Sequence, residues 1–157
     1  MTKHITDEYF KHVLDGCTEF LSNSMNIAIT SKPELYNPEC INDKNKTVIL
    51  STSGTDVNLL IGFSYDDTLL EAIANKFGLP ITEETKAEML DTTACEVANM
   101  IIGNAIIHFP NDGKGVNLSP PLVINGIKTL RNQGTTHIAK STIHTEFGDM
   151  TVDIILN

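Results

Sequence analysis

Apolar and polar residues follow a helical period over one long stretch of this chain, residues 82–109. At about 100° per residue, the apolar positions of this stretch gather on one side. These positions are Leu90, Ala94, Val97, Ala98, Ile101, Ala105 and Phe109. The spacing predicts one long helix that is capped by Thr82 and stopped by Pro110 with Asn111-Asp112-Gly113.

Two shorter stretches have the same period. The first helix begins at Thr6 or Asp7, which are good capping residues. Its inward positions are Phe10, Val13, Leu14, Cys17, Phe20 and Leu21. The second helix opens at Ser64 or Asp66 and is closed by Gly78. Its inward positions are Leu69, Leu70, Ile73, Ala74 and Phe77.

Six further stretches are predicted as β-strands. They are residues 25–30, 47–52, 57–64, 116–124, 136–146 and 150–156. Alternation is clearest in the third and the sixth of these, where every second residue points to the core. The inward positions are Val57, Leu59, Ile61, Phe63, Met150, Val152, Ile154 and Leu156. The last two strands form a hairpin that turns at residues 147–149, and residues 32–46 form a polar loop with two prolines.

The order of these elements indicates the fold class. One helix precedes three strands, and two helices precede three more strands, which differs from the alternating β-α-β order of doubly wound folds. The order predicts an α+β, two-layer domain with a largely antiparallel sheet of about six strands and helices packed on one face. No internal repeat or linker divides the sequence, so residues 1–157 are predicted to form a single domain.

Composition narrows the class of partner. The formal net charge is −9 and the 11 basic residues are scattered, which disfavours nucleic acid and anionic membranes. No apolar run reaches the roughly 20 residues of a membrane-spanning helix, and the N-terminus has no signal-peptide pattern. Cys17, Cys40, Cys95 and the five histidines lack metal-ligand spacing. We therefore expect reduced thiols, no metal site and a cytoplasmic location.

The outer face of the long helix carries polar residues at helical spacing. Glu96, Asn99 and Gly103 stand at i, i+3 and i+7, nearly opposite the apolar side. Gly103 has no side chain, so another backbone can approach this face closely. Met100 and Ile107 fall near the same face; they are either covered by the second helix or a dimer partner, or form an apolar docking surface.

Residues 91–105, Asp-Thr-Thr-Ala-Cys-Glu-Val-Ala-Asn-Met-Ile-Ile-Gly-Asn-Ala, resemble the signature helix of the CheC/CheX/FliY family of chemotaxis phosphatases. That signature is Glu-x-x-Asn followed by Gly-Asn-Ala. Residues 47–64, residues 119–126 and the C-terminal hairpin are similar to other parts of the CheX-like branch. A second Glu-x-x-Asn, at residues 34–37, lies between two prolines that disfavour a helix, and we assign it no function.

The resemblance implies a phosphatase that hydrolyses the aspartyl phosphate of a CheY-like response regulator. In this family the Glu pairs with the regulator's active-site Lys, and the Asn orients the water that attacks phosphorus. These roles fall to Glu96 and Asn99, with Met100, Gly103 and Ile107 as partner-docking residues. The regulator supplies its own Mg²⁺, so this chain is expected to bind no cofactor. The alternative is a non-catalytic adaptor of the same fold that docks a receiver or another signalling domain.

The resemblance also suggests a homodimer that pairs through the sheet. A sheet of this kind has unpaired edges that must be covered. The loop at residues 32–46 is an alternative cover for one edge.

Overall fold

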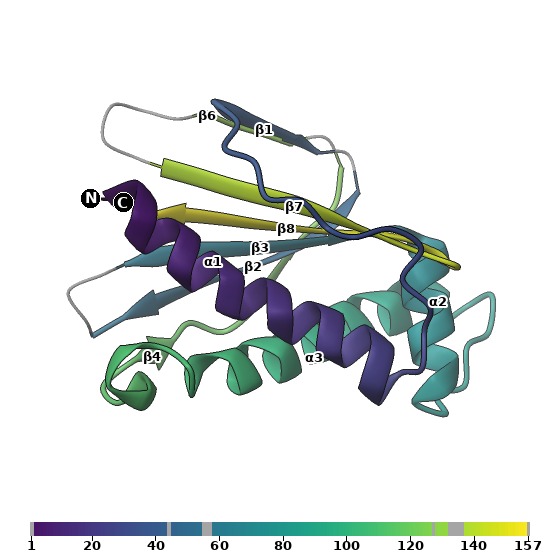
Figure 1. Ribbon diagram of the computed structural model, residues 1–157. Helices are drawn as coiled ribbons and strands as arrows, with labels where there is room; N and C mark the ends of the chain where they lie inside the picture. Colours follow the sequence, from purple (N-terminus) through teal and green to yellow (C-terminus); the bar gives the residue numbers. More distant parts are fainter. Residues whose placement is uncertain (1, 44, 55–57, 127, 132–136, 157) are drawn as a thin grey trace.

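The computed structural model of this protein describes residues 2–43, 45–54, 58–126, 128–131 and 137–156 (Figure 1). Within these residues, a six-stranded antiparallel sheet carries three helices on one face, and a separate two-stranded ribbon contacts the opposite face. The predicted α+β fold with a sheet of about six strands is therefore confirmed.

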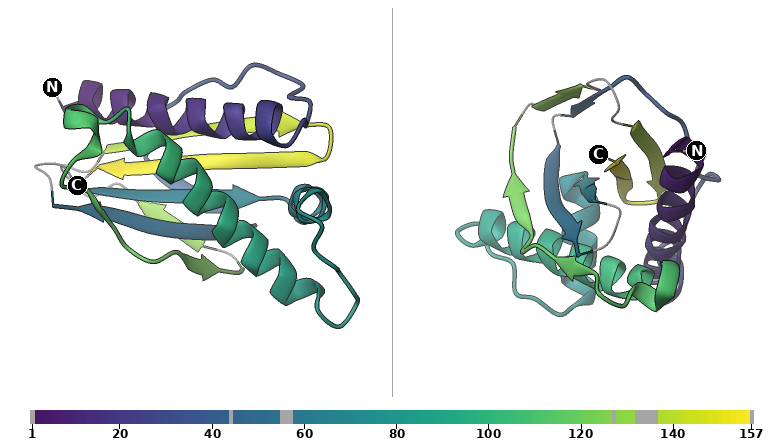
Figure 2. Two further views of the ribbon diagram at one scale, coloured as in Figure 1. Left: turned by 90° about the horizontal axis from the view of Figure 1, so that it is seen from below. Right: turned by 90° about the vertical axis from the view of Figure 1, so that its left-hand side faces the viewer.

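The helices pack together against the sheet. Helix α1 spans Thr2–Glu19 and continues as a π-helical turn, η1, over Phe20–Ser24. Helix α2 spans Asp67–Lys76, and α3 spans Lys86–Ile106. A 3₁₀ turn, η2, follows over Pro110–Gly113. Figure 2 shows α1 and α3 on the same side of the sheet.

The described residues contain eight strands, which form the sheet and the ribbon. They are β1 (Cys40–Asp43), β2 (Lys46–Ser53), β3 (Leu59–Tyr65), β4 (Asn117–Leu118), β5 (Leu122–Ile124), β6 (Lys128–Arg131), β7 (His137–Thr145) and β8 (Gly148–Leu156). The sheet order is β4-β2-β3-β8-β7, and β5 pairs with β2. Among the described strands, β1 pairs only with β6, and these two form the ribbon.

Alternation along the strands gives the sheet two different faces. One face enters the core beneath the helices. Its buried side chains include Val48, Leu50, Leu59, Ile61, Phe63, Val152 and Ile154. Alternate residues, from Thr47 and Ile49 on β2 to Asp153 and Ile155 on β8, lie on the opposite face. We call this the second face.

Two predicted helix starts are wrong. Helix α1 already begins at Thr2, so Thr6 and Asp7 lie inside it rather than at its cap. Helix α3 begins at Lys86 after an N-cap at Thr85, not at Thr82. The Oγ1 of Thr82 instead accepts a hydrogen bond from the backbone N–H of Thr85 at 3.2 Å, which organises the turn before the helix. Capping residues are abundant in both regions, and composition alone does not select among them.

Predictions for the irregular segments need correction too. Residues 25–30 form no strand, because Asn26 takes a left-handed conformation and Ile29 makes only an isolated bridge to Thr145. The predicted loop at residues 32–46 contains β1, and β6 was not predicted at all. The predicted strand at 116–124 is divided into β4 and β5 at Pro120 and Pro121, which lack the N–H that a continuous ladder needs.

Some predicted positions lie outside the described residues. They include Val57, Thr136 and part of the turn after Gly54. The other inward positions on β3 and β8 are buried as predicted. The hairpin between β7 and β8 turns at Glu146 and Phe147, one residue earlier than predicted.

Candidate functional site

Helix α3 is fixed to the domain along its whole length. Its buried side chains, which include Val97 and Ile101, lie in the main core. Gly16 of α1 lies at the crossing of the two helices, where a Cβ would be in ordinary van der Waals contact with Ile101 Cγ2 at 3.5 Å. The buried Tyr65 hydroxyl of β3 donates to the carbonyl oxygen of Ala94 at 3.4 Å. The outer face of α3 therefore stands on a well-packed base.

The predicted site residues lie together on that outer face. Glu96, Asn99 and Gly103 are exposed. Met100 is 37 % exposed and Ile107 58 %, so the second helix does not cover them. A Cβ built at Gly103 meets no atom within 4 Å, which leaves open space above the helix backbone. We call Glu96, Asn99, Met100, Gly103 and Ile107 the α3 face.

The side chains of Glu96 and Asn99 make no hydrogen bond or ion pair with another described residue. A carboxylate in this state is available to a cationic partner group. A carboxamide has both donors and acceptors and can hold a water molecule by two contacts at once. Neither residue has a neighbouring base or acid that would make it a nucleophile, so the α3 face is suited to positioning a reactant.

A polar cluster that the sequence analysis missed lies beside the α3 face. Lys46, at the start of β2, forms an ion pair with Asp91 of α3, and its Nζ donates to Asn125 Oδ1 at 2.7 Å. The Lys46 side chain is only 10 % exposed. The cluster ties the first half of α3 to β2 and to the segment after β5. Its three members come from distant parts of the chain, so no spacing in the sequence could have revealed it.

Cys95 lies between this cluster and the α3 face. Burial raises the pKa of its thiol, and the nearby carboxylates of Asp91 and Glu96 raise it further, while Lys46 lowers it. The thiol is therefore a weak nucleophile at neutral pH. Cys95 gives no sign of a reactive cysteine.

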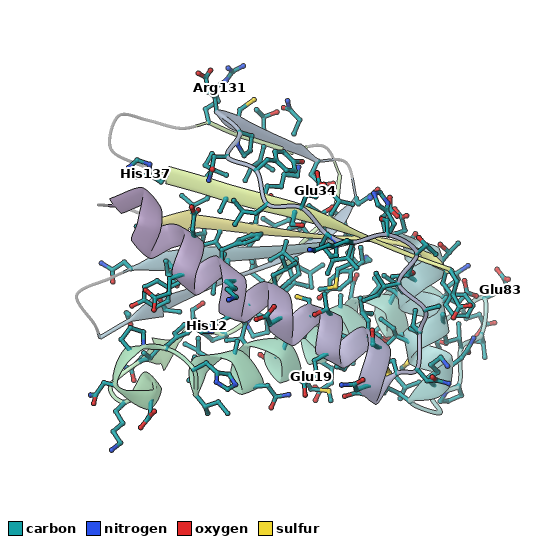
Figure 3. The ribbon with its side chains drawn as sticks, viewed as in Figure 1. His12, Glu19, Glu34, Glu83, Arg131 and His137 are labelled. Carbon is teal, nitrogen blue, oxygen red and sulfur yellow. The ribbon has the colours of Figure 1, made fainter. Side chains whose placement is uncertain are left out.

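The second Glu-x-x-Asn copy has a structural explanation. Asn37 donates its side-chain amide to the Ile138 carbonyl of β7 at 3.1 Å, which anchors the loop to the sheet. The label Glu34 in Figure 3 marks this loop, beside the strands. Residues 34–37 form no helix, so the Glu34 carboxylate does not share a helical face with Asn37.

In the part of the chain that the structure describes, no helix is long and apolar enough to cross a membrane. In the same part, no group of three or more His, Cys, Asp or Glu side chains is arranged to hold a metal ion.

Comparison with known proteins identifies the family. Residues 47–142 match the family model described as chemotaxis phosphatase CheX, and this match includes all but the first residue of β2, the whole of α3 and most of β7. No curated protein matches the sequence significantly.

Solved structures show the same fold at low sequence identity. A chemotaxis protein CheX from Desulfovibrio desulfuricans is 20 % identical with a TM-score of 0.75, over 96 % of this chain and 99 % of that one. CheX from Vibrio vulnificus is 19 % identical, again with a TM-score of 0.75 and coverages of 96 % and 99 %. The CheX of a Borrelia burgdorferi CheX–CheY–BeF₃–Mg²⁺ complex is 22 % identical with a TM-score of 0.68, over 95 % and 97 % of the chains. Because the family model covers more than half of its length, this chain belongs to the CheX family of chemotaxis phosphatases.

Proposed function

We propose that this protein hydrolyses the aspartyl phosphate of a CheY-like response regulator, with Glu96 and Asn99 of the α3 face as the working residues. The observation that carries the proposal is the pair of unpartnered polar side chains on one exposed helical face, next to the bare Gly103. Family membership supports the class of activity, and the CheX–CheY complex from Borrelia burgdorferi supports the class of partner.

The reaction requires little covalent chemistry from the side chains of this protein. An acyl phosphate is already reactive, so the main requirement is a water molecule held in line with the bond between phosphorus and the aspartyl oxygen. The water oxygen forms a new bond to phosphorus, and the aspartate leaves as a carboxylate with release of inorganic phosphate. Asn99 orients that water without bringing a further negative charge near the phosphoryl group. The regulator contributes Mg²⁺, and this chain contributes no metal ligand.

Glu96 fixes the position of the regulator by pairing with its active-site Lys. Long-range attraction does not help docking, because this chain carries a net charge of −9 and would repel an acidic receiver. Recognition then depends on local contacts: the Glu96 carboxylate, the apolar surfaces of Met100 and Ile107, and close approach over Gly103. A response regulator as substrate also implies that the protein works in the cytoplasm.

The test of catalysis is release of phosphate from a phosphorylated CheY-like regulator. We expect Asn99→Ala to lower the rate by about 10²-fold, the order of loss caused by a misplaced reactant. Asn99 is exposed, so the substitution leaves no cavity and the fold should survive. Asn75→Ala is the matched control, because Asn75 is an exposed Asn of helix α2 that lies outside the signature motif. Equal rates for the two variants would refute the role of Asn99.

Binding separates the phosphatase from the alternative, a non-catalytic adaptor. Affinity should be measured for a regulator that carries a stable phosphoryl mimic. Glu96→Lys should weaken binding more than Glu96→Ala, because it places two cations opposite each other. Binding without any phosphate release by the unmodified protein would favour the adaptor. If both Glu96 variants bind as the unmodified protein does, the regulator docks elsewhere.

We also propose a homodimer that pairs through the β4–β5 edge of the sheet. The opposite edge, β7, is bridged by Ile29 and Tyr36 of the preceding loop, which supports the β4–β5 edge as the open one. Leu122 on β5 is 62 % exposed. Light scattering at micromolar concentration should give a dimer mass, and Leu122→Asp should reduce it to that of the monomer. A monomeric mass for the unmodified protein would contradict the proposal.

A further inference from the structure

The ribbon formed by β1 and β6 encloses a small cavity against the second face of the sheet. Ile41 of β1 is buried there. The cavity has a volume of about 20 Å³, room for roughly one water molecule. The surface that lines it is mostly apolar and includes the aliphatic side chains of Ile41, Ile49, Leu60 and Ile155. Figure 1 shows the ribbon as a separate layer, and Arg131 in Figure 3 marks the end of its β6 strand.

A buried carboxyl group lines this apolar cavity. Asp153 of β8 is 5 % exposed, and its Oδ1 has no hydrogen-bond partner among the described residues. The other polar groups of the cavity are satisfied. Thr47 Oγ1 and Ser64 Oγ share a hydrogen bond of 2.8 Å, and Asp43 Oδ1 accepts from the Asn45 backbone N–H at 2.8 Å. A carboxylate at Asp153 would therefore remain without the hydration it needs.

The charged groups around Asp153 do not compensate for its burial. Asp43 faces it from β1 and Lys140 from β7, where the register places Lys140 opposite Asp153. The backbone register also places Lys128 of β6 opposite Asp43. The cavity residues of β2 and β3 carry no charge. The pKa of Asp153 is raised to about 7, chiefly by burial, while Lys140 lowers it and Asp43 raises it by smaller amounts.

We propose that Asp153 is a proton-controlled latch on the β1–β6 ribbon: the protonated acid leaves the ribbon closed, and the carboxylate opens it by drawing water beneath it. Moving the ribbon is the easiest way to hydrate this group. Strand β8 is hydrogen-bonded on both sides, to β3 and β7. Strand β1 has one buried residue, Ile41, among its four.

The latch has a defined pH window. When the ribbon opens, Asp153 becomes hydrated and recovers an ordinary carboxyl pKa near 4. The equilibrium constant for opening then rises about tenfold per pH unit between pH 4 and 7, where the open form is deprotonated and the closed form still holds its proton. Above the closed-state pKa of about 7, both forms are deprotonated and opening no longer depends on pH.

Hydrogen exchange of the ribbon amides tests this. The full chain is followed by mass spectrometry from pH 5 to 8, and each rate is divided by its intrinsic value at that pH. Protection of β1 and β6 should fall by at least tenfold between pH 5 and 7 and then level off. In Asp153→Asn the protection should stay constant to within about twofold, because the neutral amide does not titrate.

Two measurements make the test decisive. Asp112→Asn is the matched control, since Asp112 is exposed in η2 and Asn tolerates its left-handed backbone. This variant should keep the pH dependence of the unmodified protein. Carbon NMR of the Asp153 carboxyl in the unmodified protein should give a midpoint near 7. A midpoint near 4, constant ribbon protection in the unmodified protein, or the same pH dependence in Asp153→Asn would each overturn the latch.

Discussion

Gly113, just beyond the end of α3, allows a sharp test of how the site helix is terminated. Its backbone has φ +71°, a left-handed conformation that costs a non-glycine residue about 1–2 kcal/mol. A Cβ added here would lie 2.4 Å from the carbonyl oxygen of Ile106 and 2.6 Å from its Cγ2. The carbonyl oxygen of Ile106 belongs to the backbone at the end of α3, so the clash can be relieved only if the end of the helix moves.

Two other glycines allow the cost of backbone strain to be measured separately from the cost of the clash with Ile106. Gly78 has nearly the same φ, +76°, but a Cβ there meets nothing within 4 Å. Gly103 lies inside α3, also in open space, with no unusual φ. Gly78→Ala should therefore cost only the strain, about 1 kcal/mol. Gly113→Ala should cost about 3 kcal/mol, because overpacking adds about 1–3 kcal/mol. Gly103→Ala should stabilise the protein by about 0.5–1 kcal/mol through helix propensity.

The assay is equilibrium unfolding in urea at pH 7, followed by far-UV circular dichroism. The three variants should share one m-value, so that shifts in midpoint report stability alone. The decisive quantity is the difference between Gly113→Ala and Gly78→Ala, which should be about 2 kcal/mol from the clash with Ile106. A difference below about 0.5 kcal/mol would refute the reasoning, because strain alone would then explain both variants.

Two further predictions concern buried titratable groups. Asp153→Asn should stabilise the protein by up to about 4 kcal/mol at pH 8 and by much less at pH 4. The reason is that the pKa of Asp153 rises from 3.8 to about 7 on folding, and each unit is worth about 1.4 kcal/mol. Urea unfolding of the unmodified protein should accordingly show a loss of stability as the pH rises from 4 to 7. Cys17 is buried and its thiol pKa is raised strongly, so a maleimide should label it only at the rate of unfolding, as read by mass spectrometry of its peptide.

The regular core of the fold was predictable because its residues obey one period over many positions. The phase of α3 is fixed by inward residues from Leu90 to Ala105, and that phase alone places Glu96 and Asn99 outside. Strands β3 and β8 were recognisable because large apolar residues occupy every second position along them. Wherever burial is extensive, the pattern that produces it is visible in the sequence.

The ribbon was not predictable for the opposite reason. Its strands have four residues each, and β1 offers a single buried side chain, Ile41, which defines no period. Cys40 pairs with Arg131, so the partner strand lies far along the chain. The same argument applies to Lys46, Asp91 and Asn125, which meet only because β2, α3 and the segment after β5 come together in the fold. Such contacts depend on tertiary structure and leave no local pattern.

The two sides of the sheet impose different requirements on the residues they carry. Asn99 must hold a water molecule in line with a bond, and it stands on a helix whose inner side is fully packed. Asp153 lies on the second face, beneath a ribbon with little buried surface. When Asp153 becomes charged, the ribbon can open locally and admit water. Among the described residues, the α3 face and the cavity of Asp153 share no hydrogen-bond partner, so substitutions in the two places should act independently. The double variant Asn99→Ala, Asp153→Asn should therefore combine the loss of phosphatase rate of the first with the altered pH dependence of the second. A coupling between the two effects would mean that the ribbon influences α3 through the sheet.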